Sequence, residues 1–145
     1  MANYYGIARS NYFAVKDVDA FLAEMAKYPV EVITQPLKDE EGNQVDTLYG
    51  FIDADDDGGA NIWSYYEDAE DGSGDYQDIE WAEVFQRHLQ DDWVAIIMES
   101  GSEKHRYVGG LSLAFNNKGE KREIYLSNIT TLAEELGSHI LPAHY

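Results

Sequence analysis

The chain has 145 residues, of which 44% are hydrophobic and 13% aromatic, and its formal net charge at pH 7 is −18. That hydrophobic content is typical of a globular protein, so the charge alone does not predict disorder. The lack of cysteine excludes disulfides, thiolate metal sites and cysteine nucleophiles, and no apolar run approaches the roughly 18 residues that a membrane span needs. We expect a single domain over residues 1–145 in the cytoplasm.

The first third of the chain is expected to form a strand, a helix and a hairpin. Aromatic and β-branched residues predict a strand over 8–15. Apolar residues at helical spacing follow Asp17, a good N-cap, and predict a helix that Pro29 ends. Two strand-like segments on either side of a polar turn then predict a β-hairpin over 30–52.

The remainder is expected to alternate between acidic loops, helices and strands. Acidic loops are predicted near 53–60 and 67–75, with a short strand over 61–66 between them, and the periodicity becomes helical from Tyr76. The apolar run 93–98 predicts a central strand, followed by a turn at 100–104, a strand over 106–115, a turn at 116–119 and a last strand over 123–126. Ser127 is expected to cap a short helix over 129–136. The predicted fold is α+β, a mostly antiparallel sheet with two to three helices packed on one face.

The negative charge is concentrated in the middle of the chain. Residues 39–92 hold 18 of the 28 Asp and Glu residues and one of the ten Lys and Arg residues, a net charge of −17. Concentrated like charge repels itself and attracts cationic partners. Seventeen charges correspond to roughly 29 Å of duplex DNA, which fits across a domain about 40 Å wide. The first hypothesis is therefore that this segment imitates nucleic-acid phosphates, and the alternative is a solvated acidic face without a partner.

The residues expected to bind a basic partner lie in the two acidic loops and beside them. The carboxylates are Asp53, Asp55, Asp56, Asp57, Glu67, Asp68, Glu70, Asp71 and Asp75, and the aromatic anchors are Tyr65, Tyr66 and Tyr76. Charge steers association, whereas tyrosines often anchor interfaces, although they also cover sheet edges with their hydroxyls in water. We expect a basic, nucleic-acid-binding protein as partner, no direct contact with nucleic acid or membrane, and room for a homodimer through the tyrosine-rich surface.

A second hypothesis is a divalent-cation module. Asp53, Asp55 and Asp57, followed by Gly58, match the first half of a calcium loop, in which alternating carboxylates converge on one cation. The second half of that pattern fails, because Ser64 stands where a bidentate glutamate is expected. No cofactor other than Ca²⁺ is expected.

Catalytic motifs are missing from the sequence. It contains no G-x-S-x-G, phosphate loop or G-x-G-x-x-G, and its four histidines lack zinc-site spacing. A small enzyme using a pair of carboxylates is the third hypothesis. In size, charge and lack of catalytic motifs the chain resembles the small acidic accessory proteins of phages and plasmids that imitate DNA to block defence enzymes, and the acidic immunity proteins that cap nuclease toxins. The resemblance implies a non-catalytic inhibitor that occupies the basic groove of a nucleic-acid-binding enzyme or defence complex.

Overall fold

The computed structural model describes residues 4–54 and 61–143. Its elements in chain order are β1 (Tyr5–Ser10), α1 (Val18–Met25), β2 (Val30–Lys38), β3 (Gln44–Asp53), β4 (Ser64–Glu67), β5 (Asp75–Asp78), α2 (Trp81–His88), β6 (Ala95–Glu103), β7 (Tyr107–Phe115), β8 (Lys121–Tyr125), the 3-10 helix η1 (Leu126–Asn128) and α3 (Ile129–Ala133). Six strands form one sheet in the order β2-β3-β1-β6-β7-β8, and β4 pairs with β5 in a separate two-stranded sheet. All of these pairs are antiparallel, so the predicted α+β fold is confirmed.

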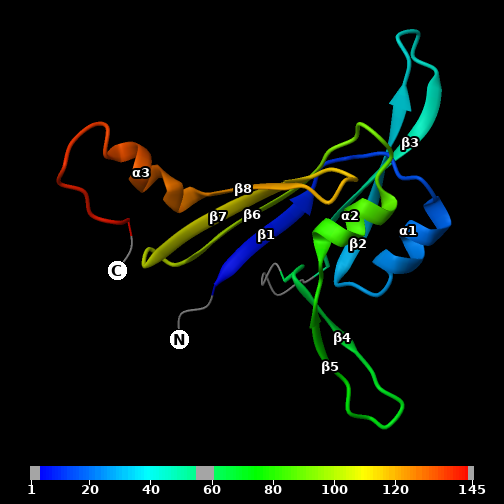
Figure 1. Cartoon of the computed structure of the whole chain (residues 1–145), viewed down its shortest axis with the longest axis horizontal. Helices are drawn as coiled ribbons and strands as arrows, with labels where there is room; N and C mark the ends of the chain where they lie inside the picture. Colours follow the sequence, from blue (N-terminus) through cyan, green and yellow to red (C-terminus); the bar gives the residue numbers. More distant parts are fainter. Residues whose placement is uncertain (1–3, 55–60, 144–145) are drawn as a thin grey trace.

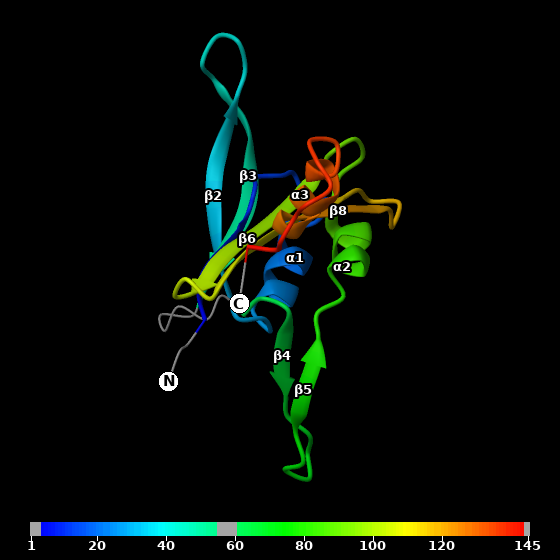
Figure 2. The same ribbon diagram turned by 90° about the vertical axis from the view of Figure 1, so that its left-hand side faces the viewer.

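Two hairpins project from the body in opposite directions. Figures 1 and 2 show the outer part of β2–β3 pointing upward and β4–β5 pointing downward. The helices α1 and α2 lie together on one face of the large sheet, whereas α3 lies beyond the end of β8. This separation places the acidic hairpins far from the C-terminal part of the chain.

Both long helices are amphipathic and carry buried side chains along one face. The Asp17 side chain caps α1 by accepting a hydrogen bond from the backbone N–H of Ala20 at 3.1 Å, which satisfies one of the free donors at the helix start. Phe21 and Met25, four residues apart, are its buried side chains. In α2 the buried residues follow the same spacing: Trp81, Val84, Phe85 and His88.

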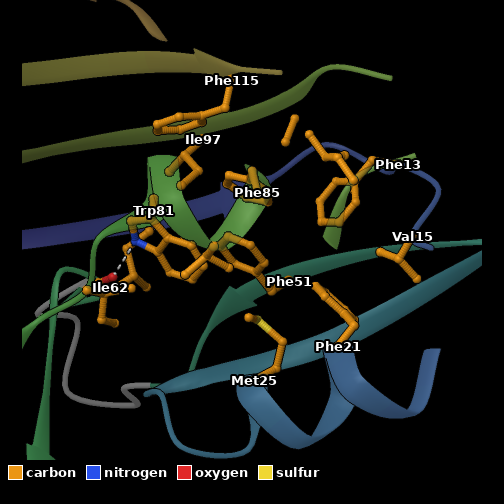
Figure 3. Packing of buried hydrophobic residues seen from close by; sticks show 14 of the residues in the cluster. Phe13, Val15, Phe21, Met25, Phe51, Ile62, Trp81, Phe85, Ile97 and Phe115 are labelled. Atoms are coloured by element: carbon orange, nitrogen blue, oxygen red, sulfur yellow. Dashed lines mark hydrogen bonds between the residues drawn. The ribbon is translucent and has the colours of Figure 1, made fainter. Parts of the chain in front are cut away.

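The core between these helices and the sheet is rich in aromatic rings. Figure 3 shows Trp81 and Phe85 of α2 packed against Phe51 of β3 and Phe115 of β7. Trp81 stacks on Phe51 with ring centroids 4.8 Å apart, and the Phe85 ring lies 5.1 Å from that of Phe115. Phe13, in the connection after β1, meets Phe85 edge to face at 5.4 Å. These contacts fix the position of α2, from which the β4–β5 hairpin extends.

A polar cluster joins the outer sides of α1 and α2. The Glu24 carboxylate accepts hydrogen bonds from the Tyr28 hydroxyl at 2.5 Å and from Arg87, and lies 2.7 Å from Nε2 of His88. Burial alone would raise the pKa of Glu24, but the hydrogen bonds from Tyr28, His88 and Arg87 outweigh it and lower that pKa to about 2. The charged form of Glu24 therefore stabilises the folded protein.

Replacing Glu24 with glutamine is expected to lower the free energy of unfolding at pH 7 by about 2 kcal/mol, because hydrogen bonds to a charged group are lost. A carboxyl whose folded-state pKa lies below its ordinary value of 4.5 contributes stability above pH 4.5 and loses it as the pH falls toward 2. The difference between wild type and Glu24→Gln should thus shrink over that range. Urea denaturation at several pH values measures it, and a difference that stays constant down to pH 2 would contradict the assignment.

The structure corrects three local predictions. Residues from Tyr76 to Asp78 form β5 rather than the start of a helix, and α2 begins only at Trp81. The predicted turn at 100–104 is mostly strand, because β6 continues to Glu103. Ser127 lies inside η1, and Asn128 is the residue that precedes α3.

Candidate functional site

The β4–β5 hairpin brings most of the predicted binding residues together. Its strands pair Ser64 with Asp78, Tyr65 with Gln77, Tyr66 with Tyr76 and Glu67 with Asp75. Residues 64–78 include six carboxylates and no Lys or Arg: Glu67, Asp68, Glu70, Asp71, Asp75 and Asp78. All six side chains are exposed. The hairpin is therefore an anionic projection of uniform sign.

Contacts at the base of the hairpin fix its direction relative to the body. The indole Nε1 of Trp63 donates to Oε1 of Glu99 on β6 at 2.7 Å, and the backbone N–H of Ile79 donates to the carbonyl of Trp63 at 2.8 Å. The indole Nε1 of Trp81 donates to the carbonyl of Ile62 at 2.9 Å. Ile62 and Ile79 are buried, so both strands enter the hairpin from the core.

A second group of contacts reinforces this base. The ring of Tyr65 packs edge to face on Tyr28, with centroids 5.0 Å apart. Glu99, which holds Trp63, also accepts a hydrogen bond from the Tyr4 hydroxyl at 3.2 Å. Burial, and then the charge and hydrogen bond of Glu99, raise the pKa of Tyr4 to about 12. Tyr65 is thus half-buried and stabilises the base of the hairpin, whereas the sequence analysis expected it to contact a partner.

Within the part of the chain that the structure describes, no basic side chain neutralises the carboxylates of the hairpin. Glu67 stands directly opposite Asp75 in the strand register, and like charges in this position repel. Within the described residues none of the six carboxylates forms an ion pair. At the tip, hydrogen bonds from the hydroxyl and the backbone N–H of Ser73 lower the pKa of Asp71. A cationic partner would relieve the repulsion along the hairpin.

One face of the hairpin presents an aromatic pair. Tyr66 and Tyr76 are opposite each other, are 51% and 67% exposed, and meet edge to face with centroids 5.5 Å apart. Neither ring reaches the core, so neither is needed there for packing. Exposed aromatic rings next to uncompensated charge give a binding surface both apolar contact and electrostatic attraction.

The charge spacing of the hairpin resembles that of a single nucleic-acid strand. From Ser64 to the tip the hairpin reaches at most about 23 Å, at roughly 3.3 Å per extended residue. Six carboxylates over that distance give about one charge per 4 Å, compared with one per 3.4 Å along one strand and one per 1.7 Å along a duplex. The hairpin alone is therefore closer to one strand than to a duplex.

The other predicted acidic residues lie elsewhere. Asp53 ends β3, and its Oδ2 accepts a hydrogen bond from the backbone N–H of Ala8 on β1 at 2.8 Å. Asp55, Asp56 and Asp57 lie outside the described residues, as does most of the predicted calcium loop. The acids Asp39, Glu40, Glu41 and Asp46 lie on the β2–β3 hairpin, which points away from β4–β5. Ten of the 18 acids in the charged middle of the chain are thus divided between two projections, four on β2–β3 and six on β4–β5.

Two residues important to this site were not singled out from the sequence. Asp78 adds a sixth carboxylate at the base of β5, and its position in the acidic run is a signal that could have revealed it. Glu99 anchors the hairpin through Trp63, 36 residues away in sequence. No local pattern reveals a contact of that separation.

A metal site and a membrane-spanning helix find no support in the described residues. Among residues 4–54 and 61–143, no group of three or more His, Asp or Glu side chains is placed to hold a metal ion. Nor does that part of the chain contain a helix with the length and apolar character required to cross a membrane. Comparisons of the chain with protein-family models, with curated proteins and with solved structures found no match.

Proposed function

We propose that the protein is a non-catalytic inhibitor that inserts its β4–β5 hairpin into the basic groove of a nucleic-acid-binding enzyme or defence complex. The observation that carries the proposal is the set of six exposed, uncompensated carboxylates on one firmly anchored hairpin. Grooves that hold single strands combine Lys and Arg along the backbone path with aromatic platforms for the bases. The Tyr66–Tyr76 pair would contact such platforms while the carboxylates replace phosphates.

The hairpin suits this function because its base holds it in one direction before binding. That base is held by hydrogen bonds from Trp63, Trp81 and Ile79. A projection whose base is already positioned loses less conformational entropy when it enters a groove, which favours affinity. Glu67 and Asp75 repel each other in the unbound protein. A cationic partner relieves this repulsion, and the relief adds to the free energy of binding.

A capture and competition experiment tests the proposal. The protein is immobilised and exposed to a bacterial lysate at low salt, and bound proteins are eluted with a salt gradient and identified. Each captured protein is then mixed with a labelled single-stranded oligonucleotide and increasing amounts of the inhibitor. The proposal predicts that a nucleic-acid-binding protein elutes in the gradient and releases its oligonucleotide. Capture without any displacement of nucleic acid would contradict it.

Two variants of equal net charge identify the surface responsible. The hairpin variant carries Glu67→Gln, Asp68→Asn, Glu70→Gln and Asp75→Asn, and leaves Asp71 in its hydrogen bonds with Ser73. The control variant neutralises four exposed acids outside the hairpin: Glu40→Gln, Glu41→Gln, Asp46→Asn and Glu83→Gln. We expect the hairpin variant to compete at least tenfold more weakly and the control to lose less than threefold, because close charges dominate the interaction. Equal losses would mean that net charge alone, and not the hairpin, determines binding.

A further inference from the structure

The large sheet has an open face that α1 and α2 do not cover. Alternate residues of its strands point to opposite faces, so the residues next to buried Ala8 and Ile97 point away from the core. On that side the sheet presents Ile7 of β1, Met98 of β6 and Ile124 of β8. Met98 and Ile124 are both paired with Ser112 of β7, so they lie on either side of this small residue. A polar face would be expected if only water covered it.

The C-terminal segment forms one wall of a groove on this face. Leu126 of η1 and Ile129 and Leu132 of α3 line the same cavity as Ile7, Met98 and Ile124, with a volume of about 800 Å³. Figure 1 shows η1 and α3 continuing from β8 at the end of the sheet opposite to α1 and α2. The groove therefore lies next to a ridge that is itself apolar.

The exposed apolar area is large for a protein without a partner. The six side chains Ile7, Met98, Ile124, Leu126, Ile129 and Leu132 are each 56 to 72% exposed. At about 110 Å² each they present about 650 Å², which exceeds the usual largest patch of a monomer and approaches the roughly 800 Å² per partner of a standard interface. Leu136 and Leu141, 93% and 91% exposed, extend the apolar surface further along the chain.

The net charge of the C-terminal segment indicates which kind of partner can cover the groove. Residues 93–145 contain six acids and five bases, a net charge of −1, although the whole chain carries −18. A basic or nucleic-acid partner would find little net charge of the opposite sign here, because the charged residues that line the groove, Arg9, Asp53 and Glu99, are of both signs. A second copy of the same chain could approach this face without strong repulsion, because the acidic hairpins point in other directions.

We propose that the open face of β1, β6 and β8, with α3, is the interface of a symmetric homodimer. A twofold interface needs a self-complementary surface, and a groove beside a ridge meets that need: α3 of each copy lies in the groove of the other. The dimer differs from one formed through the tyrosine-rich hairpin, since it leaves both β4–β5 hairpins free. Each assembly would display two anionic hairpins.

Sedimentation velocity at about 1 to 100 µM tests this inference, a range in which typical specific dimers form. The expected species has a mass of about 33 kDa, twice the 16.4 kDa of one chain. Met98→Glu and Ile124→Glu should each weaken dimerisation at least 100-fold, because a twofold interface buries each new charge twice. Both side chains are more than half exposed in one chain, so folding should be unaffected, as near-UV circular dichroism can confirm.

Val45→Glu serves as the matched control, because Val45 is 61% exposed near the start of β3 and does not line the groove. This variant should remain a dimer, and raising the salt concentration should not weaken the wild-type dimer, in contrast to binding through the acidic hairpin. The proposal would be overturned if the wild-type protein stayed monomeric over the whole concentration range, even if its groove bound an apolar dye. It would also be overturned if both groove variants remained dimeric.

Discussion

Replacing Phe85 with alanine is expected to lower the free energy of unfolding by about 3 to 5 kcal/mol, the usual cost of removing a buried phenylalanine. The Phe85 ring is fully buried on α2 and packs against Trp81 at 5.6 Å, Phe13 at 5.4 Å and Phe115 at 5.1 Å. These three rings come from the start of α2, the connection after β1 and the end of β7. The cavity would thus remove contacts that join α2 to the connection after β1 and to β7.

Urea denaturation followed by tryptophan fluorescence measures the effect, with the denaturant slope compared to confirm two-state unfolding. Tyr76→Ala is the matched control, because Tyr76 is an aromatic residue that is 67% exposed. The control should change the free energy of unfolding by less than about 1 kcal/mol, the range of an exposed cross-strand aromatic pair. A loss for Phe85→Ala no larger than for Tyr76→Ala would show that the aromatic cluster does not determine stability.

Shortening the β4–β5 hairpin is expected to abolish partner binding while leaving the fold intact. Tyr65 and Gln77 are paired across the hairpin, so an Asn-Gly turn can replace residues 66–76 and join the two strands. The replacement removes five carboxylates and the Tyr66–Tyr76 pair but none of the core residues. We expect competition with a bound oligonucleotide to fall at least 100-fold, because both the charge and the aromatic anchors are lost.

The free energy of unfolding of this variant should lie within about 1 kcal/mol of the wild-type value, because an isolated two-stranded hairpin adds little stability. Circular dichroism and urea denaturation verify this before binding is measured. Retention of full competition by a folded, shortened protein would exclude the hairpin as the binding surface.

Much of the fold follows from local patterns, and β5 shows where such patterns fail. The periodicity of α2 and the apolar run of β6 are visible in the sequence because each element buries one side in the core. All four residues of β5 are exposed, so the strand leaves no alternation of apolar and polar residues. Tyr76 and Ile79 then happened to fit the helical spacing of the segment that follows.

The extension of β6 depends on contacts that sequence alone does not specify. Ser100, Gly101 and Ser102 are typical turn residues, yet they lie inside the strand. A Cβ atom on Gly101 would lie 2.4 Å from the backbone carbonyl oxygen of Tyr5 and 2.4 Å from the Tyr4 hydroxyl oxygen, so the backbone of β1 leaves no space for a larger side chain. Glycine is required here by a neighbouring strand almost a hundred positions away.

The composition of the candidate site was visible in the sequence, but its shape was not. Its carboxylates and tyrosines are neighbours in sequence, so their proximity could be anticipated from residues 65–76. The hairpin could not, because the sequence analysis placed a loop over 67–75 and a helix from Tyr76. The placement of acids on two opposite hairpins could not be anticipated either. The direction of β4–β5 is set by the contact between Trp63 and Glu99, and the direction of β2–β3 is set by its place at the edge of the large sheet.

The salt dependence of partner binding tests the central claim most directly. Association constants of the captured partner with wild type, the four-fold hairpin variant and the four-fold control variant are measured from low to high salt. If the hairpin carboxylates act as the phosphates of a single strand, each contributes about 0.7 to the slope of log K against log salt concentration. The hairpin variant should lose about 3 from that slope, and the control should keep the wild-type value. Equal slopes for all three proteins would contradict the account.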